Sequence, residues 1–444
     1  MLFARLTIAS RSSQQGIAGV DGSSTSNEPI TLCVQKVHII LVPVGEAIDD
    51  ELVEFYYQWN RFEKTNDVEI IDCDLVQRSA DFPGAFNTRE DAAARLDELV
   101  GRYKTLNTPD PFVLHKLESS VMFLRALSGE DVPFPQYISE TIGVLPEMIP
   151  EGVLAAARAD CGARLQRNGY RFTPDDVEAF LQENRLNAAE ITAEFELAQQ
   201  IQVPAILEWL GLDVATNYEL QLVDVDKSWM AEVKTTDEGT MSLKFNVNEE
   251  RVPWIRGDPE CTVLHEVGGH VLQAAAWKER LKTGAMPPVC GLTTLHGPEN
   301  YVSEGVAETL SWFFPRALLS EAGELAVRLH CMSELYWNDA FIMAGRSRSA
   351  DEILQFLDDH MLTYRTREQR RKRLETATRD PQSRAYMYSY GISIYHHRLF
   401  AEHSSPAQNR NYLAHVFART YSYRDLARSY DGWHHQSTDR IQRY

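Results

Sequence analysis

The chain lacks several features that would place it in a specialised class of protein. Its six cysteines form no C-x-x-C pair and are scattered through 444 residues. A disulfide framework like that of small secreted domains is therefore excluded, and the cysteine usage suits a reducing compartment, so we expect a cytoplasmic protein. No uninterrupted apolar run approaches the ~20 residues that a membrane-spanning helix needs, and we expect no membrane partner.

Positive charge is also scarce. Lysine and arginine number 44 against 64 acidic residues, which leaves a formal net charge of -20. Because binding to nucleic acid requires a basic face, we expect no nucleic-acid partner. One basic run, Arg365–Arg373, is interpreted as the solvated face of a helix. The composition, 44% hydrophobic and 24% charged, is that of an ordinary globular protein with a large core.

We divide the chain into three parts. Residues 1–30 form an N-terminal extension that we expect to be disordered, because a run rich in glycine and serine, GVDGSSTSNEP, closes it. Residues 1–20 carry Arg5 and Arg11 with no acid before Asp21, which leaves organelle targeting open as an alternative. Residues 31–212 are expected to be a helical scaffold and residues 213–444 the catalytic region, within one continuous globular unit.

Apolar residues at helical spacing dominate the chain. They predict helices over Asp49–Lys64, Thr88–Leu106, Pro111–Leu127 and Pro146–Arg167, and helical character over Thr173–Trp209. Short strands are expected at Tyr218–Val223, Ser228–Lys234 and Thr240–Val247. The last of these alternates apolar and polar residues, which indicates either a half-buried structural strand or an edge strand beside a substrate. The predicted fold class is mainly α, with a small β-sheet beside the active-site helix.

One stretch, TVLHEVGGHVLQAAAW at Thr262–Trp277, carries the chemistry. Asp258-Pro259-Glu260 is a helix start, so a helix is predicted from Pro259 to about Thr283. The helix is apolar on nearly all sides and should be buried. His265, Glu266 and His270 within it need partners, because burying unpaired polar groups is costly. A bound metal ion would supply them.

The spacing of the two histidines is unusual. Zinc hydrolases commonly carry H-E-x-x-H, whereas this chain has H-E-x-x-x-H. In a regular α-helix, residues five apart lie about 140° apart around the axis and cannot easily hold one ion. A π-bulge would bring His270 back towards His265, and we predict one at Val267–Gly269. Gly268 and Gly269 suit it, because glycine tolerates unusual backbone.

A catalytic zinc ion takes three protein ligands and keeps one position for water. A second apolar helix, predicted over Glu299–Phe314, carries Glu304 and Glu308 on one face. Glu304 is the first choice for the third ligand of a single Zn²⁺ ion. Glu308 is the alternative, either as that ligand or as a carboxylate that orients a ligand histidine.

The remaining catalytic roles follow from the chemistry of peptide hydrolysis. Glu266 is expected to be the general base that deprotonates the attacking water. Tyr388 is the predicted donor to the oxyanion, with Tyr390 and His296 as alternatives. Arg398 is a candidate for binding a substrate carboxylate, although a salt bridge is the commoner role for such an arginine.

These motifs resemble those of known metallopeptidases. HEVGGH followed by SEGVAE looks like the glutamate-zinc (gluzincin) enzymes, which places Glu304 as the third ligand. The six-residue H-E-x-x-G-H form is similar to dipeptidyl peptidase III. A late Y-x-x-G segment, Tyr388 to Gly391, looks like a bacterial peptidase-like family, and the overall plan is similar to helical oligopeptidases and carboxypeptidase Taq-like enzymes. The resemblance implies a zinc-dependent hydrolase of short peptides.

Two other function classes remain open at this stage. Two histidines and one carboxylate also form the facial triad of non-haem Fe(II) enzymes. A catalytically inactive binding protein with a peptidase fold would carry the same residues. The sequence leaves open endo- or exopeptidase action, the physiological substrate and the oligomeric state.

Overall fold

The structure is a computed structural model that describes residues 6–7, 46–227, 229–236, 239–360, 366–430 and 433. Except for Leu6–Thr7, the predicted extension 1–30 lies outside the described residues. The helices in chain order are α1 (Glu46–Lys64), α2 (Arg89–Lys104), α3 (Pro111–Leu127), α4 (Phe134–Thr141), α5 (Glu151–Arg167), α6 (Pro174–Glu183), α7 (Ala188–Leu210), α8 (Asp258–Thr262), η2 (Val263–Val271), α9 (Leu272–Lys282), α10 (Asn300–Phe313), α11 (Glu321–Gly345), α12 (Ala350–His360), α13 (Arg367–Arg379), α14 (Pro381–His403), α15 (Pro406–Ala418) and α16 (Tyr423–Ser429). Two 3₁₀ turns, η1 (Ser79–Asp81) and η3 (Pro288–Gly291), complete the helical set.

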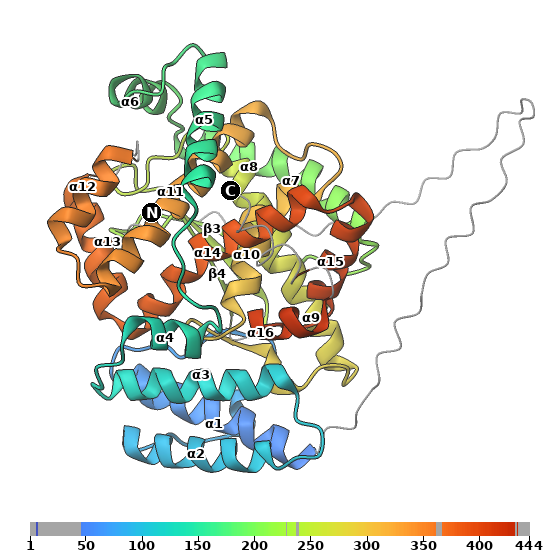
Figure 1. Cartoon of the computed structure of the whole chain (residues 1–444). Coiled ribbons are helices and arrows are strands. Elements are labelled where there is room, and N and C mark those ends of the chain that lie inside the picture. The colour runs from blue at the N-terminus through green and yellow to red at the C-terminus, as the bar shows by residue number, and fades with distance from the viewer. Residues whose placement is uncertain are drawn as a thin grey trace, which may run out of the picture.

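The expected mainly α fold with a small sheet is confirmed. Helices α1, α2 and α3 lie side by side at one end of the molecule, and α10 and α14 run through its interior (Figure 1). One large apolar core contains residues from Ile48 to Trp433, so the predicted scaffold and catalytic regions share it. Among the described residues, no helix combines the length and the apolar character that crossing a bilayer would require.

The main sheet has the strand order β1-β3-β5-β4, with β1 (Leu6–Thr7), β3 (Tyr218–Val223), β4 (Ala231–Thr235) and β5 (Met241–Asn246). Strand β5 is parallel to β3 and antiparallel to β4. It corresponds to the predicted strand Thr240–Val247, but it is neither half-buried nor an edge strand. It is paired on both sides, and its polar residues Ser242 and Asn246 are buried as well. The suggestion that this strand pairs with a substrate is therefore wrong.

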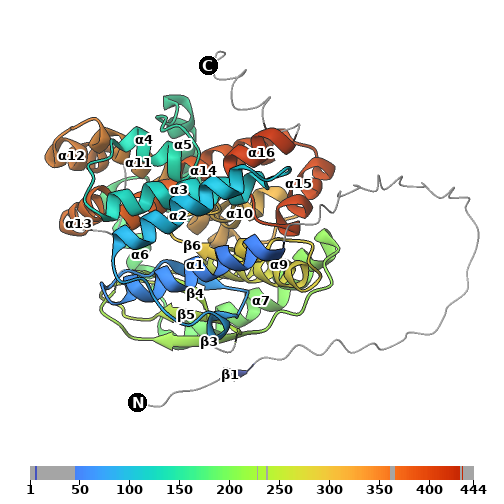
Figure 2. The same cartoon turned by 90° about the horizontal axis from the view of Figure 1, so that it is seen from below.

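A second sheet joins the two halves of the chain. Strand β2 (Ile71–Asp74) pairs antiparallel with β6 (Leu292–Thr294) and lies against β4, where the backbone N–H of Asp74 donates to Thr235 Oγ1. Figure 2 shows the strands gathered on one side of the molecule, beside α1 and α7. A strand from the predicted scaffold region thus reaches the neighbourhood of the histidine helix.

The helical character expected over Thr173–Trp209 is confirmed, and the expectation for the basic run is corrected. The first stretch consists of α6 and α7, and Asn187 and Glu190 form the capping box that starts α7. The basic run is only partly solvated. The guanidinium of Arg373 donates to both carboxylate oxygens of Glu334, at 2.8 and 2.6 Å, and lies over the Trp337 ring. Residues 361–365 lie outside the described part of the chain.

Helix α10 is held between its neighbours by glycines. A Cβ on Gly269 of η2 would lie 2.5 Å from the Ala307 Cβ of α10. A Cβ on Gly305 of α10 would collide with the His397 ring of α14. Interiors are close-packed, so such small residues set how near two helices approach. These contacts bring the histidine segment, Glu304 and the tyrosines of α14 together.

Candidate metal centre

The histidines lie on a π-helical segment, as their spacing predicts. The backbone N–H of Leu272 donates to the carbonyl of Val267, five residues earlier, which is the π pattern. The segment covers nine residues, Val263–Val271, and is longer than the predicted bulge at Val267–Gly269. Gly268 and Gly269 serve close packing against α7 and α10 within this segment.

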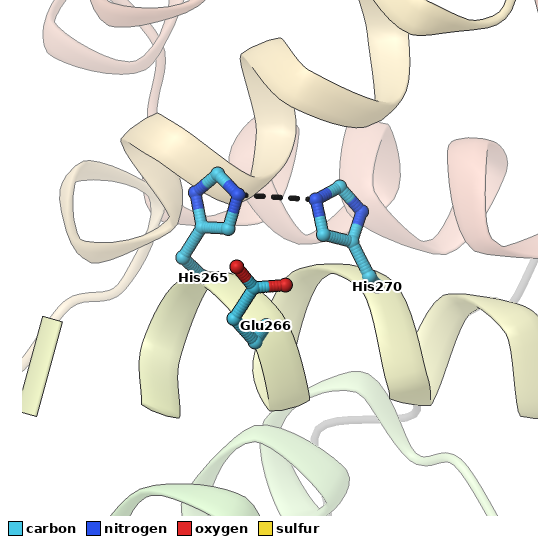
Figure 3. Close-up of side chains that lie close together, drawn as sticks. All are labelled: His265, Glu266 and His270. Carbon is cyan, nitrogen blue, oxygen red and sulfur yellow. Dashed lines mark hydrogen bonds between the residues drawn. The ribbon is translucent and has the colours of Figure 1, made fainter. Parts of the chain in front are cut away.

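Both histidine rings project from the same side of this segment. Figure 3 shows the two Nε2 atoms facing each other, and they lie 3.1 Å apart. The side chains are 18% and 20% exposed, so the site is accessible from solvent. The longer turn of the π-helix thus brings His265 and His270, five residues apart, onto one face.

Glu304 completes a triangle of ligand atoms. Its Oε2 lies 3.6 Å from the Nε2 of each histidine. A circle through three atoms with these separations has a radius of about 2.0 Å, which matches the bond lengths of zinc to nitrogen and carboxylate oxygen. This Oε2 is buried and has no hydrogen-bond partner among the described residues. A buried carboxylate oxygen aimed at two imidazoles suits a cation, so the three residues fit a metal ion.

The charges of this triangle are strongly coupled. Burial alone would lower the pKa of His270, but the negative charge of Glu304 outweighs it and raises the value to about 9. Burial likewise tends to raise the pKa of Glu304, and His270 and His265 hold it below its ordinary value. A metal ion that binds here must displace a proton from His270, which couples binding to pH.

Glu266 is placed for proton transfer. Its carboxylate lies beside the gap between the two imidazoles (Figure 3), and a carboxylate oxygen is within 4.8 Å of the ligand nitrogen of each histidine. Burial raises the pKa of Glu266, and the two histidines only partly oppose that shift. A raised pKa brings a carboxylate nearer to the operating pH of a general base.

Glu308 supports the site from behind. Its Oε1 lies 3.6 Å from the Nδ1 of His265, on the far side of that ring from the triangle. The same oxygen is 2.9 Å from the Nε2 of His330. Of the two roles considered for Glu308, this geometry fits a carboxylate that orients a ligand histidine.

The tyrosine at the site is a different one from the predicted Tyr388. The hydroxyl of Tyr386 donates to Glu304 Oε1 at 3.1 Å, and the hydroxyl of Tyr390 donates to that of Tyr386 at 2.6 Å. Tyr388 is 1% exposed and accepts from the backbone N–H of Glu147 at 3.2 Å. Residues two apart lie about 200° apart on a helix, so Tyr388 faces away when Tyr386 faces the site.

Two further candidates also lie elsewhere. His296 is fully buried, stacks on Phe123 and shares a hydrogen bond with Ser120 Oγ at 3.1 Å. Its surroundings are the apolar layer of α1 and α3, which gives it a structural role. The Nε of Arg398 donates to Glu402 at 2.6 Å in an ion pair within α14. The commoner fate of such an arginine, a salt bridge, is the one found here.

One residue at the site was missed from the sequence. Asp72 of β2 lies close enough to His270, Glu304 and Tyr386 for its charge to act on their pKa values. Burial raises the pKa of Asp72 itself to about 7. No local motif marks this aspartate, because it lies almost 200 residues before the histidines in a four-residue strand.

Comparison with known proteins adds little to this geometry. No family model matches the chain, and no curated protein matches it. Among solved structures, the chain is similar to one described as "the putative lipoprotein from Colwellia psychrerythraea", with 12% identity and a TM-score of 0.49. That match covers 87% of this chain and 75% of the other. At this level of similarity it carries no inference about function, and the site must be interpreted from its own residues.

Proposed function

We propose that the protein is a zinc-dependent metallopeptidase that hydrolyses short peptides. The proposal is supported above all by the triangle of His265, His270 and Glu304, whose sides of 3.1, 3.6 and 3.6 Å suit one zinc ion. Glu266 beside that triangle adds a base where a hydrolase needs one. The resemblance of HEVGGH and SEGVAE to gluzincin motifs points the same way.

The roles of the residues follow from their positions. When bound, a zinc ion supplies Lewis acidity to a peptide carbonyl and to water. Glu266 accepts a proton from the water while the oxygen of that water bonds to the carbonyl carbon of the peptide. It then donates that proton to the leaving amine as the C–N bond breaks. Tyr386 holds Glu304 Oε1, which leaves Oε2 free to face the histidines.

A tyrosine hydroxyl is the donor we assign to the developing oxyanion. Tyr386 and Tyr390 are both candidates, because the Tyr386 hydroxyl donates to Glu304 and the Tyr390 hydroxyl donates to Tyr386, so either one must turn its O–H from its present acceptor to the oxyanion. Burial raises the pKa of both phenols well above 10, so both stay protonated and able to donate. The compartment we propose is the cytoplasm, since the five cysteines that the structure describes are free.

The test combines metal analysis with a conservative substitution. Protein purified without added metal should contain about one zinc per chain and cleave members of a fluorogenic peptide library. Glu266→Gln should retain zinc but lower kcat by ~10²–10⁴-fold, because glutamine has the size and shape of glutamate but cannot act as a general base. Glu279→Gln is the matched control, since Glu279 is exposed on α9 and pairs with Lys282.

Three results would overturn the proposal. Iron without zinc would favour the non-haem Fe(II) alternative. Bound zinc without turnover of any peptide would favour a binding protein that keeps a peptidase-like site. Full activity in zinc-loaded Glu266→Gln would reject the mechanism.

A further inference from the structure

One carboxylate oxygen beside the metal centre lies between two histidines from different elements. Glu308 Oε1 is 3.6 Å from the Nδ1 of His265 on η2 and 2.9 Å from the Nε2 of His330 on α11. An oxygen of an ionised carboxylate has two lone pairs, so it can accept a hydrogen bond from each ring. The proposed reaction gives His330 no role of its own.

The side chains of this contact differ in their exposure. The side chain of Glu308 is 5% exposed, whereas that of His330 is 49% exposed. A buried carboxylate is costly unless a partner compensates its charge. Among the described residues, His330 supplies the hydrogen bond that the carboxylate of Glu308 accepts. An exposed histidine thus holds a buried acid.

Helix α11 fixes the position of His330. The thiol of Cys331, the next residue, contacts the backbone carbonyl of Glu308 at 3.9 Å, so two successive residues of α11 touch Glu308. Helix α11 also packs against α14, which carries the tyrosines of the site (Figure 1). The contact between His330 and Glu308 is therefore set by the packing of helices around the metal centre.

The direction in which Glu308 points matters for metal binding through His265. When the Nε2 of a histidine binds a metal, its proton lies on Nδ1, and that N–H usually donates to a carboxylate or carbonyl oxygen. Glu308 Oε1 is the carboxylate oxygen within 4.0 Å of the His265 Nδ1 among the described residues. Without the hydrogen bond from His330, this carboxylate would be free to rotate away. A contact that only joined α10 to α11 would not require the same oxygen to face both rings.

We propose that His330 is a positioning residue of the metal centre, which holds Glu308 Oε1 toward the Nδ1 of His265. This inference rests on the zinc site of the proposed function but not on peptide hydrolysis. It makes zinc affinity depend on an exposed residue that is not itself a ligand.

The experiment measures zinc affinity by chelator competition in the full-length protein, in a double-mutant cycle of His330 and Glu308. We expect Glu308→Gln to weaken zinc binding about 10–100-fold, the usual loss for a partner of a ligand, and His330→Ala to weaken it about tenfold. Because His330 acts through Glu308, adding His330→Ala to Glu308→Gln should change the affinity less than about twofold. His330→Gln should restore most of the affinity of His330→Ala, since a side-chain amide keeps an N–H donor. His403→Ala is the matched control, because this exposed histidine contacts the Leu399 carbonyl within its own helix.

Three results would overturn the positioning role. Losses that add in the double variant would mean that His330 acts independently of Glu308. Unchanged zinc affinity in His330→Ala, with a lower free energy of unfolding, would leave only a tie between two helices. Tighter zinc binding in His330→Ala would mean that His330 competes with His265 for the carboxylate. If the coupling is found but the wild-type protein cleaves no peptide, the positioning role stands and the proposed reaction falls.

Discussion

Two pairs of histidines lie against helix α10, and they differ in what their nitrogens contact. In the pair on α14, His397 Nδ1 donates to the Ser393 carbonyl and Nε2 accepts from the Tyr412 hydroxyl, both at 2.8 Å. His396 lies between the Tyr301 hydroxyl, at 2.6 Å, and Glu147, at 2.8 Å. Every ring nitrogen of this pair has a protein partner.

The pair on η2 is arranged in the opposite way. The Nε2 atoms of His265 and His270 face each other at 3.1 Å, and the nearest carboxylate oxygen, from Glu304, has no hydrogen-bond partner among the described residues. Buried polar groups with complementary partners stabilise a fold, whereas converging ligand atoms without partners suit a cation. The same residue types thus serve structure in one place and, as we propose, metal binding in the other.

Truncating one histidine in each pair should separate these roles most clearly. His270→Ala should weaken zinc binding by about 10²–10³-fold, because zinc-binding free energies of ~10–16 kcal/mol are shared among four ligands. His397→Ala should leave zinc affinity nearly unchanged and lower the free energy of unfolding by about 2–4 kcal/mol. Competition titration with a zinc chelator and chemical denaturation measure the two effects. Equal effects on zinc affinity would contradict the comparison.

The second prediction concerns the close contact between η2 and α10 at Gly269 and Ala307. Gly269→Ala should destabilise the protein by about 3 kcal/mol, the upper end of overpacking, since its Cβ would lie 2.5 Å from that of Ala307. Gly101→Ala is the control. A Cβ at position 101 would meet no neighbouring atom within 4 Å, and the position lies on the exposed side of α2. The substitution should therefore raise the free energy of unfolding by ~0.5–1 kcal/mol. Urea unfolding of both variants checks this, and a tolerated Gly269→Ala would show that α10 can shift.

Substitutions of Tyr386 and Tyr388 test whether Tyr386, and not Tyr388, is the tyrosine of α14 that faces the site. Tyr386→Phe removes the donor to Glu304 and should weaken zinc binding about 10–100-fold, the usual cost of losing a partner of a ligand. Tyr388→Phe should leave zinc affinity unchanged, because its hydroxyl contacts the backbone of Glu147. The measurement is the same chelator competition. If Tyr388→Phe weakened zinc binding more than Tyr386→Phe did, Tyr388 would be the tyrosine that acts at the site.

The smallest expected effect is the pH dependence of stability that His397, in the histidine pair of α14, contributes. Burial lowers the pKa of His397 to about 3, against ~6.5 in an unfolded chain. Between these values the unfolded state binds the proton and the folded state does not, so stability falls as pH falls from about 6.5 towards 3. At pH 5.5 the loss should be ~1.4 kcal/mol relative to pH 8.

Chemical denaturation at pH 8 and at pH 5.5 measures this loss in the free energy of unfolding. His397→Ala should abolish this share of the pH dependence. His403→Ala, at an exposed position of the same helix, should keep it. If both variants show the full loss at pH 5.5, other groups are responsible.

The local sequence determined the histidine segment well. His265, Glu266 and His270 lie in one apolar stretch, and their i, i+5 spacing required the π-helix that the structure contains. Helical periodicity placed Glu304 and Glu308 on one face of a second apolar segment, and the resemblance to gluzincin motifs favoured Glu304. The π-helix could be predicted because it depends on residues within about two turns of one another, whereas the role of Glu304 as a ligand stays a prediction.

Only the tertiary structure decided which tyrosine faces the site and that the charge of Asp72 acts on His270. The phase of α14 about its axis depends on packing, where Gly391 meets α11 and Gly305 meets His397, and no local pattern in a run of tyrosines reveals it. Asp72 lies near enough to His270 to act on its pKa, in a strand whose pairing joins segments some 220 residues apart. Periodicity assigns a residue to a face of its own element, but contacts between distant elements are set by how their surfaces pack.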